Sequence, residues 1–225
     1  MTRVGVTSDR FETVASRYAA VGLEPVSLPC IRIDTASPDA IASAREKAAR
    51  AQLLIITSPR VVSLLWPDGD MPEVNTAVVG STTASCVTRA GGRLALVGDS
   101  GMARLVELME SRVHGQKVMI AHAEGSDPAA MARLREIVPD LDEHPVYRAV
   151  PIPPNADKVE AVAFASPSAV TGWAISRNFD DVVVGAIGAT TAATVARHRE
   201  PDVVAEQRSH LALAGAIASL MEVKV

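Results

Sequence analysis

The sequence predicts an α/β protein made of two similar domains, each with a parallel sheet. Short apolar runs alternate with alanine-rich amphipathic segments, and one pair of strand-to-helix turns occurs twice. Size and composition agree with this, because 225 residues with 48% hydrophobic content can bury two cores of about 100 residues each. We therefore expect two cores rather than one.

The repeated turns have a common design, in which an apolar run ends in a small hydroxyl residue and a helix then begins. Residues 57–59 and 79–84 recur as residues 165–167 and 187–192. Ser58 precedes Ser166 by 108 positions, and Gly80 precedes Gly188 by the same 108. The two pairs are therefore in one register, with no insertion between their members.

The individual elements follow from apolar periodicity and from residues typical of helix ends. Strands are expected at residues 4–7, 24–33, 53–56, 77–79, 94–97, 116–122, 143–152, 162–164 and 182–187. Helices are expected at residues 11–21, 38–50, 102–111 and 128–138, and after each repeated turn. Ser37 and Ser58 are suitable N-caps, and Gly91 and Gly92 offer a C-cap to the helix that follows Gly80.

Two extended segments, at residues 25–33 and 145–152, each follow a helix and are set off by prolines. We expect the chain to cross between domains there, near residues 25–36 and 145–154. The first domain is then discontinuous, with residues 1–34 and 152–225. The second domain is inserted into it as residues 36–149.

Composition excludes several classes of partner. The net charge is −4 and the basic residues are scattered, so no basic patch is available for nucleic acid or an anionic membrane. No apolar run reaches the roughly 20 residues that span a bilayer, and the N-terminus lacks a signal-peptide pattern. We expect a cytoplasmic protein.

Cysteine and histidine patterns give no indication of a metal. Cys30 and Cys86 are far apart and are expected to be buried thiols. The five histidines lack the spacing of metal ligands, and each is expected at the surface or in a loop: His114, His122, His144, His198 and His210. The sequence predicts no metal site.

The repeated turns are suited to binding anions. Helix starts leave backbone N–H groups unpaired in a region of partial positive charge, and Gly80 and Gly188 let a ligand approach closely. The alternative is that the Ser and Thr residues simply cap the helices. Duplication in register favours two like sites for one ligand that carries several acidic groups.

Five segments carry a resemblance to a known family: residues 55–62, 78–84, 146–148, 164–170 and 187–192. In order and spacing, over nearly the whole chain, they resemble uroporphyrinogen-III synthase. The resemblance implies two flavodoxin-like, three-layer domains joined by a two-stranded connection, with the active site in the cleft between them. It also implies a lyase without cofactor or metal, which cyclises hydroxymethylbilane to uroporphyrinogen III in haem biosynthesis, losing water and inverting ring D.

The resemblance further implies roles for particular residues. Tyr147 matches the tyrosine of the connecting strand and is the candidate general acid for the departing hydroxyl; a packed interdomain aromatic is the alternative. The expected carboxylate binders act through backbone amides and hydroxyls: Ser58, Arg60, Ser81, Thr82, Thr83, Ser166, Ser168, Thr190 and Thr191. Because Ser168 stands where the first copy has Arg60, a solvated arginine is an equal alternative for that residue.

Three positions depart from the family pattern. Asp9 and Glu124 place acidic groups near the expected polyanion site, and Ala189 replaces a usual proline. Two alternatives stay open: a protein of the same fold that binds a tetrapyrrole or another polyanion without converting it, and a two-domain receptor for a phosphorylated small molecule. We expect a monomer, and transfer of the substrate from hydroxymethylbilane synthase is left open.

Overall fold

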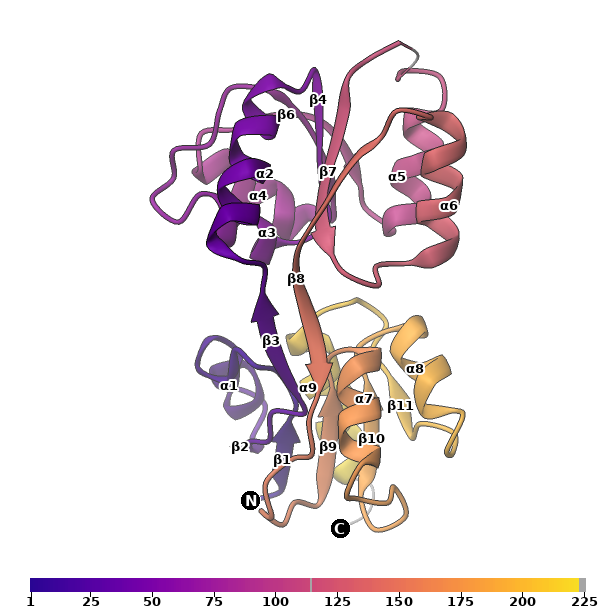
Figure 1. The fold of residues 1–225 in the computed structure, drawn as a ribbon. Helices are drawn as coiled ribbons and strands as arrows, with labels where there is room; N and C mark the ends of the chain where they lie inside the picture. The colour runs from indigo at the N-terminus through magenta and orange to yellow at the C-terminus, as the bar shows by residue number, and fades with distance from the viewer. Residues whose placement is uncertain (114, 223–225) are drawn as a thin grey trace. The chain divides into compact units, whose positions relative to one another are not determined.

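The computed structural model describes residues 1–113 and 115–222, which fall into two compact units (Figure 1). Unit 1 comprises Met1–Ile33 and Ala149–Val225, and unit 2 comprises Asp34–Arg148. The domain boundaries expected from the sequence, residues 1–34 with 152–225 and residues 36–149, describe domains that fold independently. These boundaries stay a prediction. His114, one of the five histidines considered above, lies outside the described residues.

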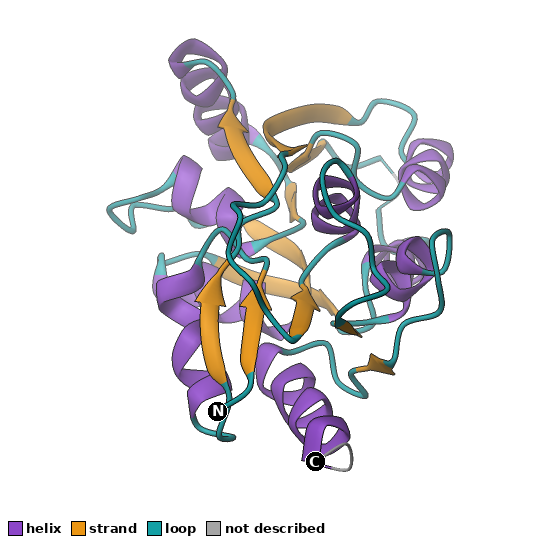
Figure 2. Ribbon diagram, turned by 90° about the horizontal axis from the view of Figure 1, so that it is seen from below, coloured by secondary structure: helices purple, strands orange, loops and turns teal. Residues whose placement is uncertain are grey.

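Unit 1 is built on a five-stranded sheet in the order β11-β10-β9-β1-β2. Its strands are β1 (Arg3–Val6), β2 (Glu24–Ser27), β9 (Ala161–Phe164), β10 (Val183–Ala186) and β11 (Val203–Val204), and their pairings are parallel. Its helices are α1 (Phe11–Ala19), α7 (Pro167–Ala174), α8 (Ala189–Val195) and α9 (His210–Glu222). Figure 2 shows the parallel strands beside the N-terminus with helices next to them.

Both faces of this sheet are covered, because side chains alternate along each buried strand. In β9, Ala161 and Ala163 join the core formed with α1 and α9, whereas Val162 and Phe164 join the core formed with α7 and α8. The strands therefore appear in the sequence as continuous apolar runs.

Gly172 in α7 permits a close approach of helix and chain within unit 1. A Cβ at this position would lie only 1.9 Å from the carbonyl oxygen of Cys30 and 2.6 Å from that of Ile152. These atoms belong to backbone that is itself hydrogen-bonded, since the Ile152 N–H donates to the Cys30 carbonyl at 2.9 Å. No side chain fits between the helix and this backbone.

Unit 2 carries most of a six-stranded sheet in the order β3-β8-β7-β4-β5-β6. The strands are β3 (Ile31–Thr35), β4 (Leu53–Ile56), β5 (Asn75–Val79), β6 (Arg93–Gly98), β7 (Val118–Ala123) and β8 (Asp142–Pro151). The helices are α2 (Pro38–Arg50), α3 (Pro59–Leu65), α4 (Ser81–Arg89), α5 (Met102–Met109) and α6 (Pro128–Ile137). The two passages of the chain between the units run along β3 and β8, which are neighbours in this sheet.

In unit 2, too, side chains alternate between the two faces of the sheet, and each face has its own core. Leu54 and Ile56 of β4 pack with α2, α3 and α4, and Leu53 and Ile55 pack with α5 and α6. β8, β7, β4, β5 and β6 pair in parallel, so their carboxyl ends share one edge. The α/β class and the parallel sheets predicted from the sequence are confirmed.

Several expected elements need correction. The extended segment at residues 24–33 is two strands, β2 and β3, which belong to different sheets and are separated at Leu28, Pro29 and Cys30. Strand β11 and helix α9 were not predicted. α9 is apolar on nearly all sides, so it lacks the one-sided pattern by which a surface helix is recognised.

Three histidines and one cysteine also differ from expectation. His144 lies on β8, and its side chain is only 14% exposed. His122 lies on β7 and is only 7% exposed, and His210 is half-buried in α9, where its Nδ1 is 2.9 Å from the Tyr18 hydroxyl. Cys30 is buried as expected, but Cys86 is only half-buried.

Candidate active-site residues

In each unit, the residues predicted to bind substrate follow strands whose carboxyl ends share an edge of the sheet. In unit 2 they follow β4 and β5, and in unit 1 they follow β9 and β10. Tyr147 lies on β8 opposite Ala123, the last residue of β7, and thus at the same edge as the unit 2 residues. Loops at this edge of an open parallel sheet are where ligands usually bind.

Tyr147 and Ser58 are in direct contact. Their hydroxyl oxygens are 3.1 Å apart, and either group can be the donor. Ser58 has the extended backbone of an N-cap, with φ −157° and ψ 157°, yet its side chain makes no capping hydrogen bond to α3. The expectation that the Ser58 side chain caps this helix is therefore wrong, because its hydroxyl contacts the phenol instead.

Arg60 is the second side chain that contacts Tyr147, and it completes a group of three with Tyr147 and Ser58. Its Cζ atom lies 5.4 Å from the centre of the Tyr147 ring, within the range of a cation–π interaction. The side chain is half-buried, as is that of Tyr147. The structure therefore places the Arg60 cation beside the candidate general acid.

A cavity of about 210 Å³ adjoins Tyr147 within unit 2. Glu124 and Asp34 line it together with Arg148, whose guanidinium pairs with Asp34 at 3.2 Å. The Glu124 N–H donates to the Tyr147 carbonyl at 2.8 Å, which holds the two chain segments together. Glu124, which departs from the family pattern, thus lines the same cavity as Tyr147.

The second turn of unit 2 presents exposed and buried residues side by side. Gly80 has φ 81°, a left-handed conformation that favours glycine, and it precedes α4. Ser81 and Thr82 are exposed, but Thr83 is only 2% exposed and points into the core. Any contact between Thr83 and a ligand would therefore come from its backbone.

The equivalent turns of unit 1 show the same division. Thr190 is exposed, whereas Thr191 is only 3% exposed. Ser166 differs from its counterpart Ser58, because its hydroxyl accepts a hydrogen bond from the Ala169 N–H at 3.2 Å and so caps α7. Ser168 is half-buried near the start of this helix.

Thr7 is a positioning residue that the sequence reasoning missed. Its buried hydroxyl donates to the Ala163 carbonyl at 2.9 Å and accepts from the Ala165 N–H at 3.2 Å. It therefore joins the end of β1 to the turn that presents Ser166. The available signal was the threonine at the end of the first predicted strand, residues 4–7.

His122 lies at the carboxyl end of β7, one residue before the partner of Tyr147. Its Nδ1 is 2.8 Å from the Ala123 carbonyl, so Nδ1 carries the proton that is donated there. Burial lowers the pKa of His122, and Nε2 has no hydrogen-bond partner among the described residues. The ring is neutral at pH 7.

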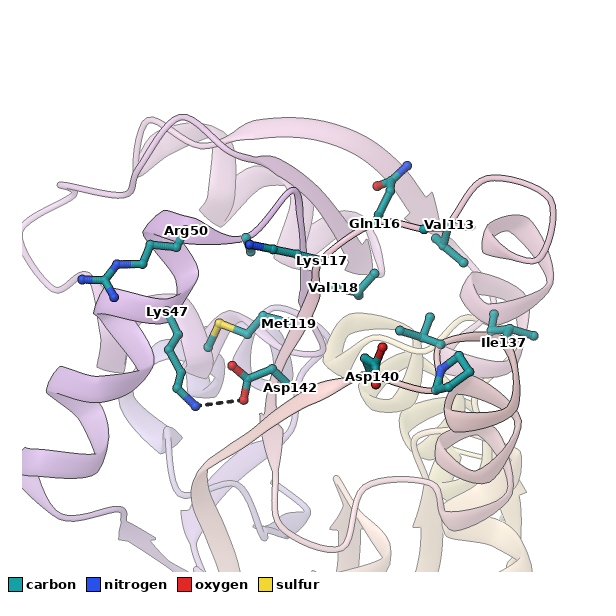
Figure 3. Close-up of a pocket in the computed structure, with 14 residues that line it drawn as sticks. Lys47, Arg50, Val113, Gln116, Lys117, Val118, Met119, Ile137, Asp140 and Asp142 are labelled. Atoms are coloured by element: carbon teal, nitrogen blue, oxygen red, sulfur yellow. Dashed lines mark hydrogen bonds and ion pairs between the residues drawn. The ribbon is translucent and has the colours of Figure 1, made fainter.

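A second concave region of unit 2 lies away from these residues. It has a volume of about 450 Å³ and adjoins the start of β7, at the amino edge of the sheet. Figure 3 shows Lys47 reaching Asp142, with a distance of 3.0 Å, while Val113 and Ile137 lie on the other side. Because Tyr147 is at the opposite edge, we assign this cavity no part in catalysis.

Within residues 1–113 and 115–222, no group of three or more His, Cys, Asp or Glu residues is arranged to hold a metal ion. No helix in this part of the chain is long and apolar enough to cross a membrane.

Comparison with solved structures shows the same fold in uroporphyrinogen-III synthases. The enzyme from Helicobacter pylori matches with a TM-score of 0.70 and 15% identity, covering 98% of this chain and all of that one. A mutant enzyme from the extremely thermophilic bacterium Thermus thermophilus matches with a TM-score of 0.65 and 16% identity, covering 99% of each chain. A comparison with curated proteins found no match. The family model described as uroporphyrinogen-III synthase HemD matches residues 12–214. The chain belongs to this family of enzymes of tetrapyrrole biosynthesis.

Proposed function

We propose that the protein cyclises hydroxymethylbilane to uroporphyrinogen III, acting as a lyase that releases water and inverts ring D. The observation that carries this proposal is the Tyr147 phenol, which contacts the Ser58 hydroxyl and lies under the Arg60 cation. Membership of the family supports the same reaction. The reaction is a dehydration with no net oxidation, so it needs no redox cofactor.

The first chemical step is the departure of the ring A hydroxyl. Tyr147 donates its proton to that oxygen, which leaves as water with the C–O electron pair, so that an electrophilic azafulvenium cation and the Tyr147 phenolate remain. Ser58 accepts or donates at the phenolic oxygen and so restricts the direction of the O–H bond. The substituted carbon of ring D then attacks to give a spiro intermediate, which fragments and recloses with ring D inverted. The ring D carbon that forms the last bond loses its proton as the pyrrole regains aromaticity, and the phenolate takes a proton back.

The main contribution of the protein is to hold the two ends of a reactive substrate in the geometry for spiro attack. We propose that the eight substrate carboxylates bind at the repeated turns. Their exposed or half-buried residues offer hydroxyls and unpaired N–H groups: Ser58, Ser81, Thr82, Ser166, Ser168 and Thr190. Thr83 and Thr191 contribute through backbone N–H groups, because their side chains are buried.

The finer domain organisation belongs to the same proposal. We propose two flavodoxin-like domains, at residues 1–34 with 152–225 and at 36–149, that act on one substrate molecule. The helices on both faces of each sheet support this description. We further propose that the protein acts as a monomer and receives its substrate from hydroxymethylbilane synthase.

The test supplies freshly generated hydroxymethylbilane and separates the uroporphyrin I and III isomers after oxidation. We expect an excess of isomer III over the enzyme-free control. Tyr147→Phe should lower kcat by roughly 10²-fold, the usual contribution of a general acid. Tyr18→Phe is the matched control, because it removes the other phenol, which contacts His210 and is not among the proposed substrate-binding residues.

A folded wild-type protein that yields only isomer I would contradict the proposal. That result would favour the second candidate, a binding protein of the same fold that holds a tetrapyrrole without converting it. The acidic side chains of Glu124 and Asp34 in the cavity beside Tyr147 are the observation that favours this candidate.

A further inference from the structure

The 108-residue register extends beyond the repeated turns. Helix α5 begins at Met102 and helix α9 begins at His210, so both follow the same offset. Each helix comes after the strand next to β5 or β10, namely β6 in unit 2 and β11 in unit 1. The register therefore aligns Ser100 with Arg208 in the loops before these helices.

Arginine and serine exchange places between the two units. In unit 2 the position after the first repeated turn is Arg60, and in unit 1 its counterpart is Ser168. In the loop before the last aligned helix, unit 2 has Ser100 and unit 1 has Arg208. Each unit thus has one arginine at these two aligned positions. In unit 2 it is at the first position, and in unit 1 it is at the second.

The structure places Arg208 directly beside a repeated turn. A Cβ built on Gly188 would lie 3.7 Å from Arg208 Cγ and 4.0 Å from Cδ, so the aliphatic stem of the arginine runs alongside this turn. Gly188 precedes α8, and the neighbouring Thr190 is exposed. Because β10 and β11 pair in parallel, both loops emerge at the same edge of the sheet.

Arg208 is available to a ligand. Its side chain is exposed, and in the part of the chain that the structure describes it has neither an ion pair nor a hydrogen bond. A guanidinium presents parallel N–H donors that match a carboxylate, and it stays charged at any pH of interest. This combination suits a carboxylate held at the Gly188 turn.

We propose that Arg208 binds an acetate or propionate carboxylate of the tetrapyrrole, as the counterpart in unit 1 of Arg60 in unit 2. This inference rests on the proposed function and assigns a specificity-determining residue within it. The role is binding only: Arg208 gives no proton to the reaction, and it favours substrates that carry a carboxylate at the corresponding position.

The test compares Arg208→Gln with Arg197→Gln in steady-state formation of isomer III. Arg197 is a matched control because it is exposed, lies in the same unit beyond the far end of α8, and has no ion pair among the described residues. Arg208→Gln should raise KM roughly tenfold, the low end of the range for a charge-assisted contact, while kcat stays within about twofold. Arg208→Lys should recover part of the loss, since it restores charge without the paired donors.

The KM of Arg208→Gln should also depend less on salt than that of the wild type, because one charge contact is gone. An unchanged KM in Arg208→Gln, equal to that of Arg197→Gln, overturns the inference while leaving the synthase reaction intact. If the wild type forms no isomer III, calorimetric titration with uroporphyrin III tests the inference separately. A roughly tenfold weaker affinity in Arg208→Gln supports it, and equal affinities overturn it.

Discussion

Ser58 and Tyr147 are 89 positions apart in the sequence, and their hydroxyl oxygens are 3.1 Å apart in the structure. The serine lies at a helix start, where its side chain would ordinarily cap the backbone, and it contacts the phenol instead. Its counterpart, Ser166, does cap its helix. The same residue in the same repeated turn therefore has a different role in each unit.

This difference predicts opposite results for two alanine variants. Ser166→Ala should lower the free energy of unfolding by about 1 kcal/mol, because a capping hydrogen bond is lost. Ser58→Ala should change the free energy of unfolding by less than about 0.5 kcal/mol and lower kcat by roughly tenfold, because the phenol loses its orienting partner. Urea denaturation and isomer analysis measure the two effects. The interpretation is wrong if Ser58→Ala turns over at the wild-type rate.

Two helical glycines should respond oppositely to alanine. Gly172→Ala would place a methyl 1.9 Å from a backbone oxygen, so we expect a loss of more than about 3 kcal/mol or no folded protein. Gly215→Ala in α9 meets no atom within 4 Å and should stabilise by about 0.5–1 kcal/mol. Chemical denaturation of both variants checks the pair, and a destabilised Gly215→Ala would show that α9 packs differently.

The free energy of unfolding should decrease at acidic pH because His210 is half-buried in its neutral form. Burial, and secondarily the charge of Arg17, lowers its pKa from 6.5 to about 4. Because the folded state holds the neutral ring, its contribution is complete above about pH 6.5 and is lost as pH falls towards 4. His210→Gln removes this titration while leaving a hydrogen-bonding group beside the Tyr18 hydroxyl.

The measurement is urea denaturation of wild type and His210→Gln at several values between pH 7 and 4. The stability advantage of the wild type should shrink steadily over that interval. A constant difference would contradict the assignment. Burial also lowers the pKa of His122, so protonation of His122 should likewise decrease the free energy of unfolding as pH falls. The same measurement on His122→Gln separates this contribution from that of His210.

Thr7 gives a further test of how the unit 1 turn is held. Thr7→Val keeps the shape of the side chain but removes a buried hydroxyl with two backbone partners, Ala163 and Ala165. We expect a loss of about 1–3 kcal/mol in the free energy of unfolding. Thr171→Val is the control, because its exposed hydroxyl bonds only to the preceding turn of α7. Similar losses in both variants would argue against a stabilising role for the two hydrogen bonds of the Thr7 hydroxyl.

Local signals predicted much of the fold. Ser37 accepts from the Ala40 N–H as expected, and α2 has the bounds anticipated from its cap and its apolar period. The partnership of Ser58 with Tyr147 could not be predicted in this way, because it depends on which strand lies beside the turn. The inward orientation of Thr83 was available from the sequence, since it lies four residues before the buried Val87 on one helix face. The role of Arg208 was also within reach, once the register was followed past the turns.

The order in which the strands pair has a consequence for how the chain acquires its structure during synthesis. Val4 of the first strand pairs with Ala161, so the centre of the unit 1 sheet cannot form until most of the chain has emerged. Unit 2 is continuous from Asp34 to Arg148 and is complete before β9 exists. Since domains fold largely as units from the N-terminal side onward, the inserted unit has the opportunity to fold first. The N-terminal residues, although made earliest, then join their sheet late, and nascent chains arrested near residue 150 would contain unit 2 folded and β1 without its β9 partner.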